Sequence, residues 1–186
     1  MMQELSMNVL DVAENSMRAQ SENVMITITE DSVKDLLSIV IQDDGCGMTE
    51  EQVRQVTDPF FTTRTTRKVG LGVPLFKMAA EMADGEFSIK SKPGEGTTTS
   101  ATFRLSHIDR MPMGDIASTI QMLICSHEDV NVEYTHTVDG RAFTVSTNQL
   151  KEVLEGVPLE TPEIRMFVGD YLKENIDALY NTEEIK

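Results

Sequence analysis

Ile41-Gln42-Asp43-Asp44-Gly45-Cys46-Gly47-Met48 is the stretch from which the organisation of this chain can be worked out. It begins as the end of a β-branched strand, predicted over Leu36 to Gln42, and continues as two acids and two glycines one residue apart. Glycines at this spacing let the backbone approach a flat ring, and an acid at a strand end can accept a hydrogen bond from an exocyclic amine. Taken alone, the stretch favours an ordinary Asp-Gly turn.

A polar stripe lies on the helix predicted from Leu5 to Ala19. Asp11, Asn15 and Arg18 stand at i, i+4 and i+7, so a helix gathers an acid, an amide and a guanidinium on one side. An amide oxygen can complete the shell of a Mg²⁺ that already holds phosphates, and a guanidinium can meet a phosphate oxygen. The stripe suits a metal-bound polyphosphate, and it suits a solvated helix surface equally well.

Two further glycine-rich elements follow. Val69-Gly70-Leu71-Gly72-Val73 opens a predicted helix with Pro74 in its first turn, and Pro93-Gly94-Glu95-Gly96-Thr97-Thr98 comes after that helix. Unpaired amides and the positive end of a helix favour anions. A second β-branched strand is predicted over Val24 to Glu30, before the first stretch.

The charge distribution supports an anionic ligand. The chain carries 31 acids against 16 Lys and Arg, a formal charge of -15. The loop from Phe61 to Lys68 nevertheless contains Arg64, Arg67 and Lys68 and no acid. A basic loop beside a glycine-rich helix start is what a polyphosphate pocket needs. The net acidity argues against a duplex nucleic-acid surface.

The order and spacing of these elements resemble the ATPase superfamily of DNA gyrase, chaperone, mismatch-repair and sensor histidine kinase ATPases, whose fold is called the Bergerat fold. Ala13-Glu14-Asn15-Ser16 with the Asp43 stretch is similar to the mismatch-repair branch. Asp58-Pro59-Phe60-Phe61-Thr62-Thr63-Arg64 and the later glycine elements resemble histidine kinases. The match covers about Leu5 to Leu105. It implies an α/β (α+β) two-layer sandwich with a mixed, mostly antiparallel sheet, helices on one face, and ATP between the helices and a lid.

The resemblance also implies roles for single residues. Asn15 would ligand Mg²⁺, Asp43 would accept the adenine amino group, and Thr98 would help to hold that amine through water. Gly45 and Gly47 would flank the base. The amides of the helix start would face the phosphates, and these and the other expected nucleotide-binding residues are Gly70, Leu71, Gly72, Val73, Met48, Phe60, Arg64 and Lys68.

Asp11 departs from the family pattern. Gyrase-like and mismatch-repair ATPases carry Glu there as a general base for water, whereas histidine kinases usually carry Asn and transfer the phosphoryl group. Aspartate keeps a carboxylate that is one methylene shorter. We assign Asp11 as general base and Arg18 as a phosphate contact, with the alternative that Asp11 only buffers the metal or Arg18.

Residues 106–186 are predicted as a small α+β extension that follows an ATP-binding domain at residues 1–105. Their pattern indicates a helix over 115–125, a hairpin at Asp139-Gly140, and helices over 149–155 and 162–180. An apolar stripe on the last helix either packs on the rest of the protein, which we favour, or forms a partner or homodimer surface. Its residues are Ile164, Phe167, Val168, Tyr171, Leu172 and Leu179.

Several classes of protein are not expected. No apolar run of ~18 residues and no charged leader followed by an apolar stretch is visible, so neither a membrane span nor a secretory signal is predicted. Cys46 and Cys125 form no metal or disulfide pattern, and a reducing cytoplasm is the simplest location. There is no room for a phospho-accepting hairpin before the Asp11 helix, and all three histidines follow the ATPase region. Autophosphorylation in the two-component manner is therefore not expected.

Three functions follow from the sequence. The first is a regulatory module that binds ATP and Mg²⁺, changes the conformation of its lid with nucleotide state, and acts on another protein. The second is a protein kinase of the anti-sigma or switch-kinase type that phosphorylates Ser on a partner. The third is a nucleotide-dependent scaffold with little or no catalysis. A carboxylate at Asp11 favours phosphoryl chemistry over none, but it does not separate water from a protein hydroxyl as acceptor.

Overall fold

The computed structural model of the chain describes residues 4–58 and 71–181. Its strands are β1 (Asn23–Asp31), β2 (Leu36–Asp43), β3 (Phe87–Lys92), β4 (Gly96–Arg104), β5 (Asn131–Val138) and β6 (Arg141–Ser146). Its helices are α1 (Leu5–Arg18), α2 (Glu50–Thr57), α3 (Gly72–Met82), α4 (Ile116–Ser126), α5 (Thr147–Val153) and α6 (Pro162–Tyr180).

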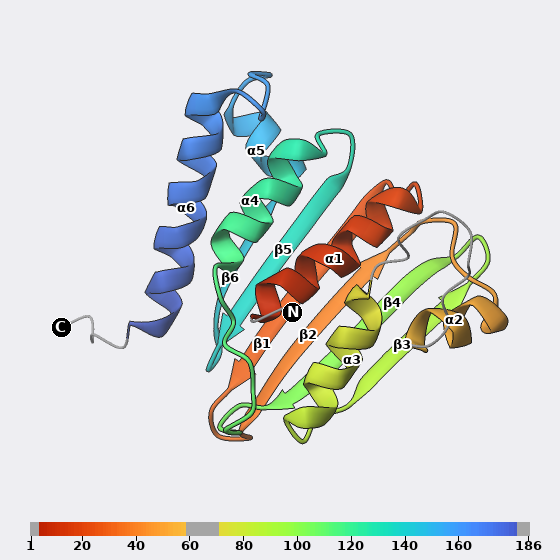
Figure 1. Cartoon of the computed structure of the whole chain (residues 1–186). Helices are drawn as coiled ribbons and strands as arrows, with labels where there is room; N and C mark the ends of the chain where they lie inside the picture. Colours follow the sequence, from red (N-terminus) through yellow and green to blue (C-terminus); the bar gives the residue numbers. More distant parts are fainter. Residues whose placement is uncertain (1–3, 59–70, 182–186) are drawn as a thin grey trace.

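The described strands form one sheet in the order β3-β4-β2-β1-β5-β6. β1 and β5 run parallel, while β1–β2, β2–β4, β3–β4 and β5–β6 are antiparallel pairs. Figure 1 shows α1 crossing the middle of this sheet, with α3 on one side of it and α4 on the other. The expectation of a mixed, mostly antiparallel sheet in an α+β fold is confirmed.

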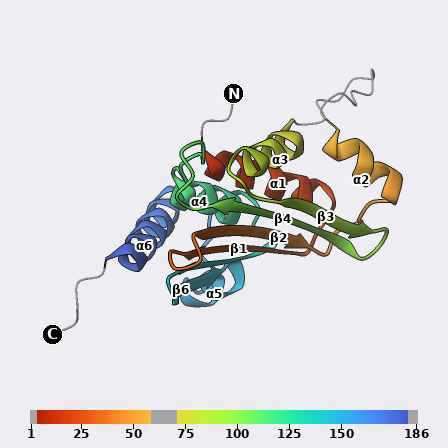
Figure 2. The same cartoon turned by 90° about the horizontal axis from the view of Figure 1, so that it is seen from below.

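Buried and exposed side chains alternate along the strands, and this alternation decides which face of the sheet the helices cover. Val24, Ile26 and Ile28 of β1 are fully buried, whereas the side chain of Met25 between them is 43% exposed. Because successive strand residues point to opposite faces, one face of the sheet is apolar and the other is largely polar. α1, α3 and α4 lie together over one face (Figure 2). Helical residues at spacings of three and four, including Val9 and Val12 of α1, complete the core there.

The C-terminal residues continue the sheet. β5 aligns with β1 over its whole length, with Asn23 opposite Asn131 and Glu30 opposite Val138. α4 packs against α1 and α6. The helix, hairpin and two helices expected after residue 105 are therefore present, and the hairpin is an edge of the same sheet. The boundary between two domains at residue 105 stays a prediction. Within the described ranges, no helix has both the length and the apolar character needed to cross a membrane.

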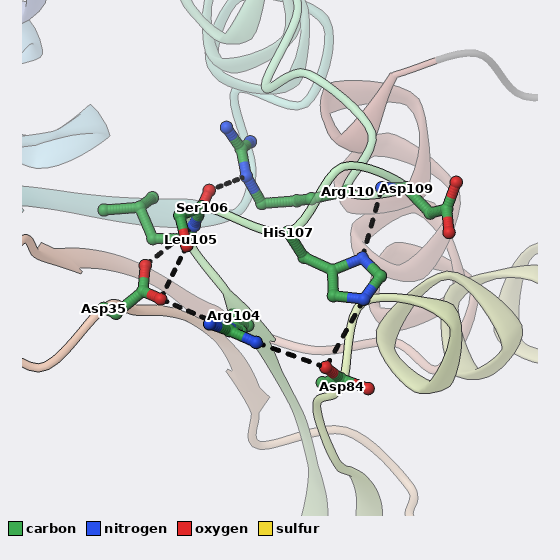
Figure 3. Close-up of polar contacts among 8 residues, drawn as sticks. All are labelled: Asp35, Asp84, Arg104, Leu105, Ser106, His107, Asp109 and Arg110. Carbon is green, nitrogen blue, oxygen red and sulfur yellow. Dashed lines mark hydrogen bonds and ion pairs between the residues drawn. The ribbon is translucent and has the colours of Figure 1, made fainter.

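A polar cluster fixes the chain where it leaves β4 (Figure 3). Asp35, in the β1–β2 turn, accepts hydrogen bonds from Arg104 Nε at 3.0 Å and Ser106 Oγ at 2.7 Å. Asp84 Oδ2 lies 3.7 Å from Arg104 Nη1 and 3.4 Å from His107 Nε2. Hydrogen bonds from Ser106, then from Arg104, hold the pKa of Asp35 below its usual range. The cluster joins three turns at the end of β2 remote from Asp43.

A second cluster fastens the end of α6 to the sheet. The buried His136 shares a hydrogen bond of 2.7 Å between its Nδ1 and the Tyr134 hydroxyl, and its Nε2 lies 3.1 Å from Glu30 Oε1. Tyr180, in the last turn of α6, donates its hydroxyl to the same Glu30 oxygen. Burial raises the pKa of Glu30, but the hydrogen bonds from His136 and Tyr180 outweigh burial, so that the pKa lies below its ordinary value.

We predict that Glu30→Gln lowers the free energy of unfolding by about 1–3 kcal/mol at neutral pH, because the charged partner of the buried His136 and of the Tyr180 hydroxyl is lost. A carboxylate with a depressed pKa stabilises the fold above the pKa of the unfolded chain and loses this contribution as pH falls through its folded pKa. The difference between wild type and variant should therefore shrink as the solution is acidified. Urea denaturation at neutral and acidic pH would measure it, and a gap independent of pH would contradict the assignment.

Candidate functional site

A cavity of about 210 Å³ lies between α1, the end of β2, the loop that follows it, and the start of α3. One wall is apolar, and a carboxylate, an amide and a guanidinium lie at its edge. The apolar wall comes from five elements, because α2 and β3 contribute beside α1, α3 and the loop after β2. The residues that line the cavity are Val12, Asn15, Ser16, Arg18, Ala19, Asp43, Cys46, Gly47, Met48, Val56, Val73, Ile89, Thr97 and Thr99.

Asp43 is held firmly at the end of β2. Ser16, buried on α1, donates its hydroxyl to Asp43 Oδ2 at 2.6 Å, and the Gly45 amide donates to Oδ1 at 3.0 Å. Each carboxylate oxygen keeps further acceptor capacity after these bonds. An oriented acceptor beside an apolar wall can recognise a flat ring that carries an amino group.

The neighbouring Asp44 has a different role. Its carboxylate accepts hydrogen bonds from the amides of Glu22 and Asn23 at 2.8 and 2.9 Å and from Asn23 Nδ2 at 2.8 Å. Asp44 therefore closes the start of β1 and does not face the cavity. The two adjacent acids of the sequence are divided between a structural and a site position.

Close backbone approach explains the glycines of this region. A Cβ at Gly47, whose φ is +67°, would lie 1.9 Å from the carbonyl oxygen of Lys92. A Cβ at Gly45 would lie 2.7 Å from Ser21 Oγ. Gly47 lines the cavity, whereas Gly45 contributes its amide to Asp43. Met48 also lines the cavity, and its amide donates to Ser91 Oγ at 2.8 Å.

The structure corrects the position of the cavity threonine. Thr97 is opposite Asp43 in the β2–β4 pairing, and Thr98 is opposite Gln42. Directly opposed residues project to the same face, so Thr98 lies on the face of the sheet away from the cavity. Thr97 and Thr99 line the cavity instead. The hydroxyl of Thr97 also lies 2.8 Å from Ser91 Oγ.

Asn15 and Arg18 lie together at the cavity edge, as the helical spacing predicts. Both line the cavity, and Arg18 Nη1 donates to Asn15 Oδ1 at 3.4 Å. Asp11 lies one turn before Asn15 on α1 and packs against the start of α3. A Cβ at Gly72 would be 2.6 Å from Asp11 Cβ and 2.8 Å from its Oδ2. Burial raises the pKa of Asp11, opposed by the charge of Arg18. The Asp11 carboxylate therefore lies beside the start of α3, with a pKa above its ordinary value.

The start of α3 is formed by Leu71, Gly72 and Val73. Leu71 is the N-cap and makes no side-chain hydrogen bond to the first turn, and Val73 lines the cavity. First-turn amides without a side-chain cap remain available to an anion. Four other residues expected to bind the nucleotide lie outside the described part of the chain. They are Phe60, Arg64, Lys68 and Gly70.

The family model for histidine kinase-, DNA gyrase B-, and HSP90-like ATPases matches residues 1–107. The chain belongs to this family. Among curated proteins, the Sensor protein DegM of Bacillus sp. (strain B21-2) is 35% identical over 89 residues. The aligned region is 48% of this chain and 24% of DegM, so the chain spans about a quarter of that relative's length.

Solved structures agree on the fold of this histidine kinase-like ATPase. The N-terminal domain of a DNA repair protein superposes with a TM-score of 0.53 at 12% identity, over 97% of this chain and 58% of that chain. The Aquifex aeolicus MutL ATPase domain complexed with ADP gives a TM-score of 0.50 at 17% identity, over 84% of this chain and 69% of that one. At these identities the likeness shows the fold alone.

Sequence reasoning missed several cavity residues of this ATPase domain. In the sequence, Ser16 is only the last residue of Ala13-Glu14-Asn15-Ser16, whereas in the structure its hydroxyl orients Asp43. Val56 and Ile89 form part of the apolar wall from elements that carry no motif. For Thr97 a signal existed, because the apolar residues Ala101 and Phe103 are an even number of positions beyond Thr97 and Thr99, and all four share one face.

The two adjacent threonines give a matched test. We predict that Thr97→Val weakens ATP binding by about tenfold, because a polar group in the cavity is lost while Ser91 keeps its bonds to Met48 and Gly96. Thr98→Val should leave the affinity unchanged. Calorimetric titration of both variants with ATP would measure this, and the reverse order of effects would restore Thr98 to the site.

Proposed function

We propose that this histidine kinase-like ATPase domain binds Mg-ATP in the cavity and acts in the cytoplasm as a regulatory module whose nucleotide state is read by another protein. The observation that supports the proposal most strongly is the Asp43 carboxylate, oriented by Ser16 and Gly45 at the edge of an apolar cavity. Adenine matches this arrangement because it combines two apolar faces with an exocyclic amine.

The side chains at the cavity edge fit the phosphates and their metal. Mg²⁺ is usually held by one or two protein oxygens together with substrate phosphates and water, so that a single amide such as Asn15 can be sufficient. In residues 4–58 and 71–181 no group of three or more His, Cys, Asp or Glu side chains could hold a metal by itself. Bound Mg²⁺ would neutralise phosphate charge, and Arg18 can turn from Asn15 towards a phosphate oxygen.

Asp11 favours phosphoryl chemistry over a purely structural role. Its carboxylate lies beside the start of α3, where the phosphates would meet free amides. A pKa raised by burial makes the carboxylate a stronger base. The proton that it accepts can come from water, which gives slow hydrolysis, or from a serine hydroxyl of a partner, which gives a protein kinase. The serine kinase is therefore the second candidate function.

Asp43→Asn tests nucleotide recognition. The side-chain oxygen of the new amide can still accept from the Gly45 amide, and its N–H group can donate to Ser16 Oγ, so the fold should persist. Its second N–H, however, presents a donor toward the adenine amine. We expect ATP affinity to fall by at least about tenfold, whereas affinity for GTP, whose base carries an acceptor oxygen in place of that amine, should not fall. Calorimetry with both nucleotides and a thermal unfolding control would decide. Unchanged preference for ATP in a folded variant would refute the role of Asp43.

Asp11→Asn tests the chemical step separately from binding. General bases contribute about 10²–10⁴-fold, so phosphate release from Mg-ATP should fall by about a hundredfold or more while ATP affinity changes little. In the wild type, release should rise with pH through the pKa of Asp11 and then level off, because only the carboxylate form accepts a proton. Single-turnover measurements of phosphate release at a series of pH values would show this rise. If the same rise persisted in the Asp11→Asn variant, Asp11 would not be the general base.

A further inference from the structure

An exposed apolar surface lies on the outer side of α6 and on the neighbouring α5. In α6 the side chains of Phe167 and Tyr171 are 48% and 36% exposed, and Val153 in α5 is 72% exposed. We call these three residues the α5–α6 patch. It belongs to the edge of the sheet at β6, two strands beyond β1, whereas the nucleotide cavity lies at β2 and β4.

The patch surrounds a hollow. Phe167 and Tyr171 of α6 and Val153 of α5 line a depression of about 390 Å³ together with residues of β6. Its floor is apolar at Val145 and Leu150, which are buried. A hollow with an apolar floor and exposed apolar walls accepts apolar side chains of a partner and excludes water from them.

The aromatic residues of the patch are already ordered. The rings of Phe167 and Tyr171 stack with centroids 6.2 Å apart, and Tyr171 also meets Phe143 of β6 edge-on at 5.6 Å. α6 itself is fixed below them, because Gln121 of α4 donates to the carbonyl of Arg165. Aromatic side chains that are already held in place lose little entropy on binding, and aromatic residues are enriched at protein interfaces.

Acids prevail in the segment that carries the patch. From residue 150 to residue 174, which the structure describes throughout, the basic residues are Lys151, Arg165 and Lys173, and the ammonium of Lys151 already donates to the carbonyl of Glu128. Glu152 is exposed and lines the hollow itself, whereas Asp170 and Lys173 line a separate cavity between α4 and α6. The other acids of this segment, all exposed, are Glu155, Glu160, Glu163 and Glu174.

We propose that the α5–α6 patch docks a cationic amphipathic helix of a partner protein. Apolar side chains spaced three and four residues apart would enter the hollow at Phe167 and Tyr171, and Lys or Arg on the flanks would meet Glu152 and the exposed acids of the same segment. A two-fold contact of the patch with itself would place one acidic segment against another, which disfavours a second copy. An anionic lipid surface would be repelled for the same reason.

The test uses the full chain and a defined probe. The probe is a labelled Leu/Lys peptide of about 18 residues, five helical turns, with Leu on one face. Two control peptides have the same Leu and Lys content in scrambled order, or Glu in place of Lys. The patch variant Val153→Gln/Phe167→Gln changes two exposed side chains that line the hollow, and Met78→Gln/Met82→Gln on α3, 49% and 55% exposed, is its matched control. Fluorescence anisotropy measures peptide affinity, and light scattering measures the mass of the protein.

We expect the patch variant to bind the amphipathic Lys peptide about tenfold or more weakly, and the α3 variant to bind it as the wild type does. Glu152→Gln should also weaken binding, because Glu152 lines the hollow, whereas Glu81→Gln on α3 should not. Equal binding of the scrambled or Glu peptide would overturn the proposal. So would a patch variant with wild-type affinity, or a dimer that the patch variant abolishes. ATP affinity should stay constant in every variant, so failure here is separate from failure of the nucleotide site.

Discussion

The close approach of three backbone segments at the end of β2 is the constraint on which the nucleotide cavity depends. A Cβ at Gly96 would lie 2.0 Å from the carbonyl oxygen of Asp43, and a Cβ at Gly47 would lie 1.9 Å from that of Lys92. The loop after β2 and the β3–β4 turn can therefore touch only because both positions lack a side chain. This contact places Thr97 beside Asp43 and brings the Met48 amide to Ser91.

Most of the site could be predicted from the sequence because its polar residues stand in short motifs with helical or strand spacing. Asn15 and Arg18 needed only a helix to meet, and Asp43 needed only a strand that ends before two glycines. The face of β4 was harder to predict, because a step of one residue between Thr97 and Thr98 reverses the side of the sheet. The wall from α2 and β3 was missed because it depends on contacts between distant segments.

The last helix shows a similar limit. Val168 and Leu172 are buried, while Phe167 and Tyr171, one position earlier in each case, are exposed. Adjacent residues of a helix are separated by about 100° around its axis, so one broad apolar stripe can belong to two surfaces. The expectation that the stripe packs on the protein holds for its buried half. Which residues turn outward depends on where α4 lies, and the sequence of α6 does not contain that information.

The parallel pairing of β1 with β5 also has a consequence for how the protein is made. Asn23 of β1 pairs with Asn131 of β5, so β1 gains one of its two neighbouring strands only after more than a hundred further residues have been synthesised. Until β5 arrives, β1 is an edge strand rich in valine, isoleucine and threonine, which is the kind of edge that attracts other chains. A ribosome-bound chain that ends near residue 107 would hold every cavity residue described above and yet be prone to aggregate. The C-terminal third thus covers a sheet edge that the ATPase domain would expose without it.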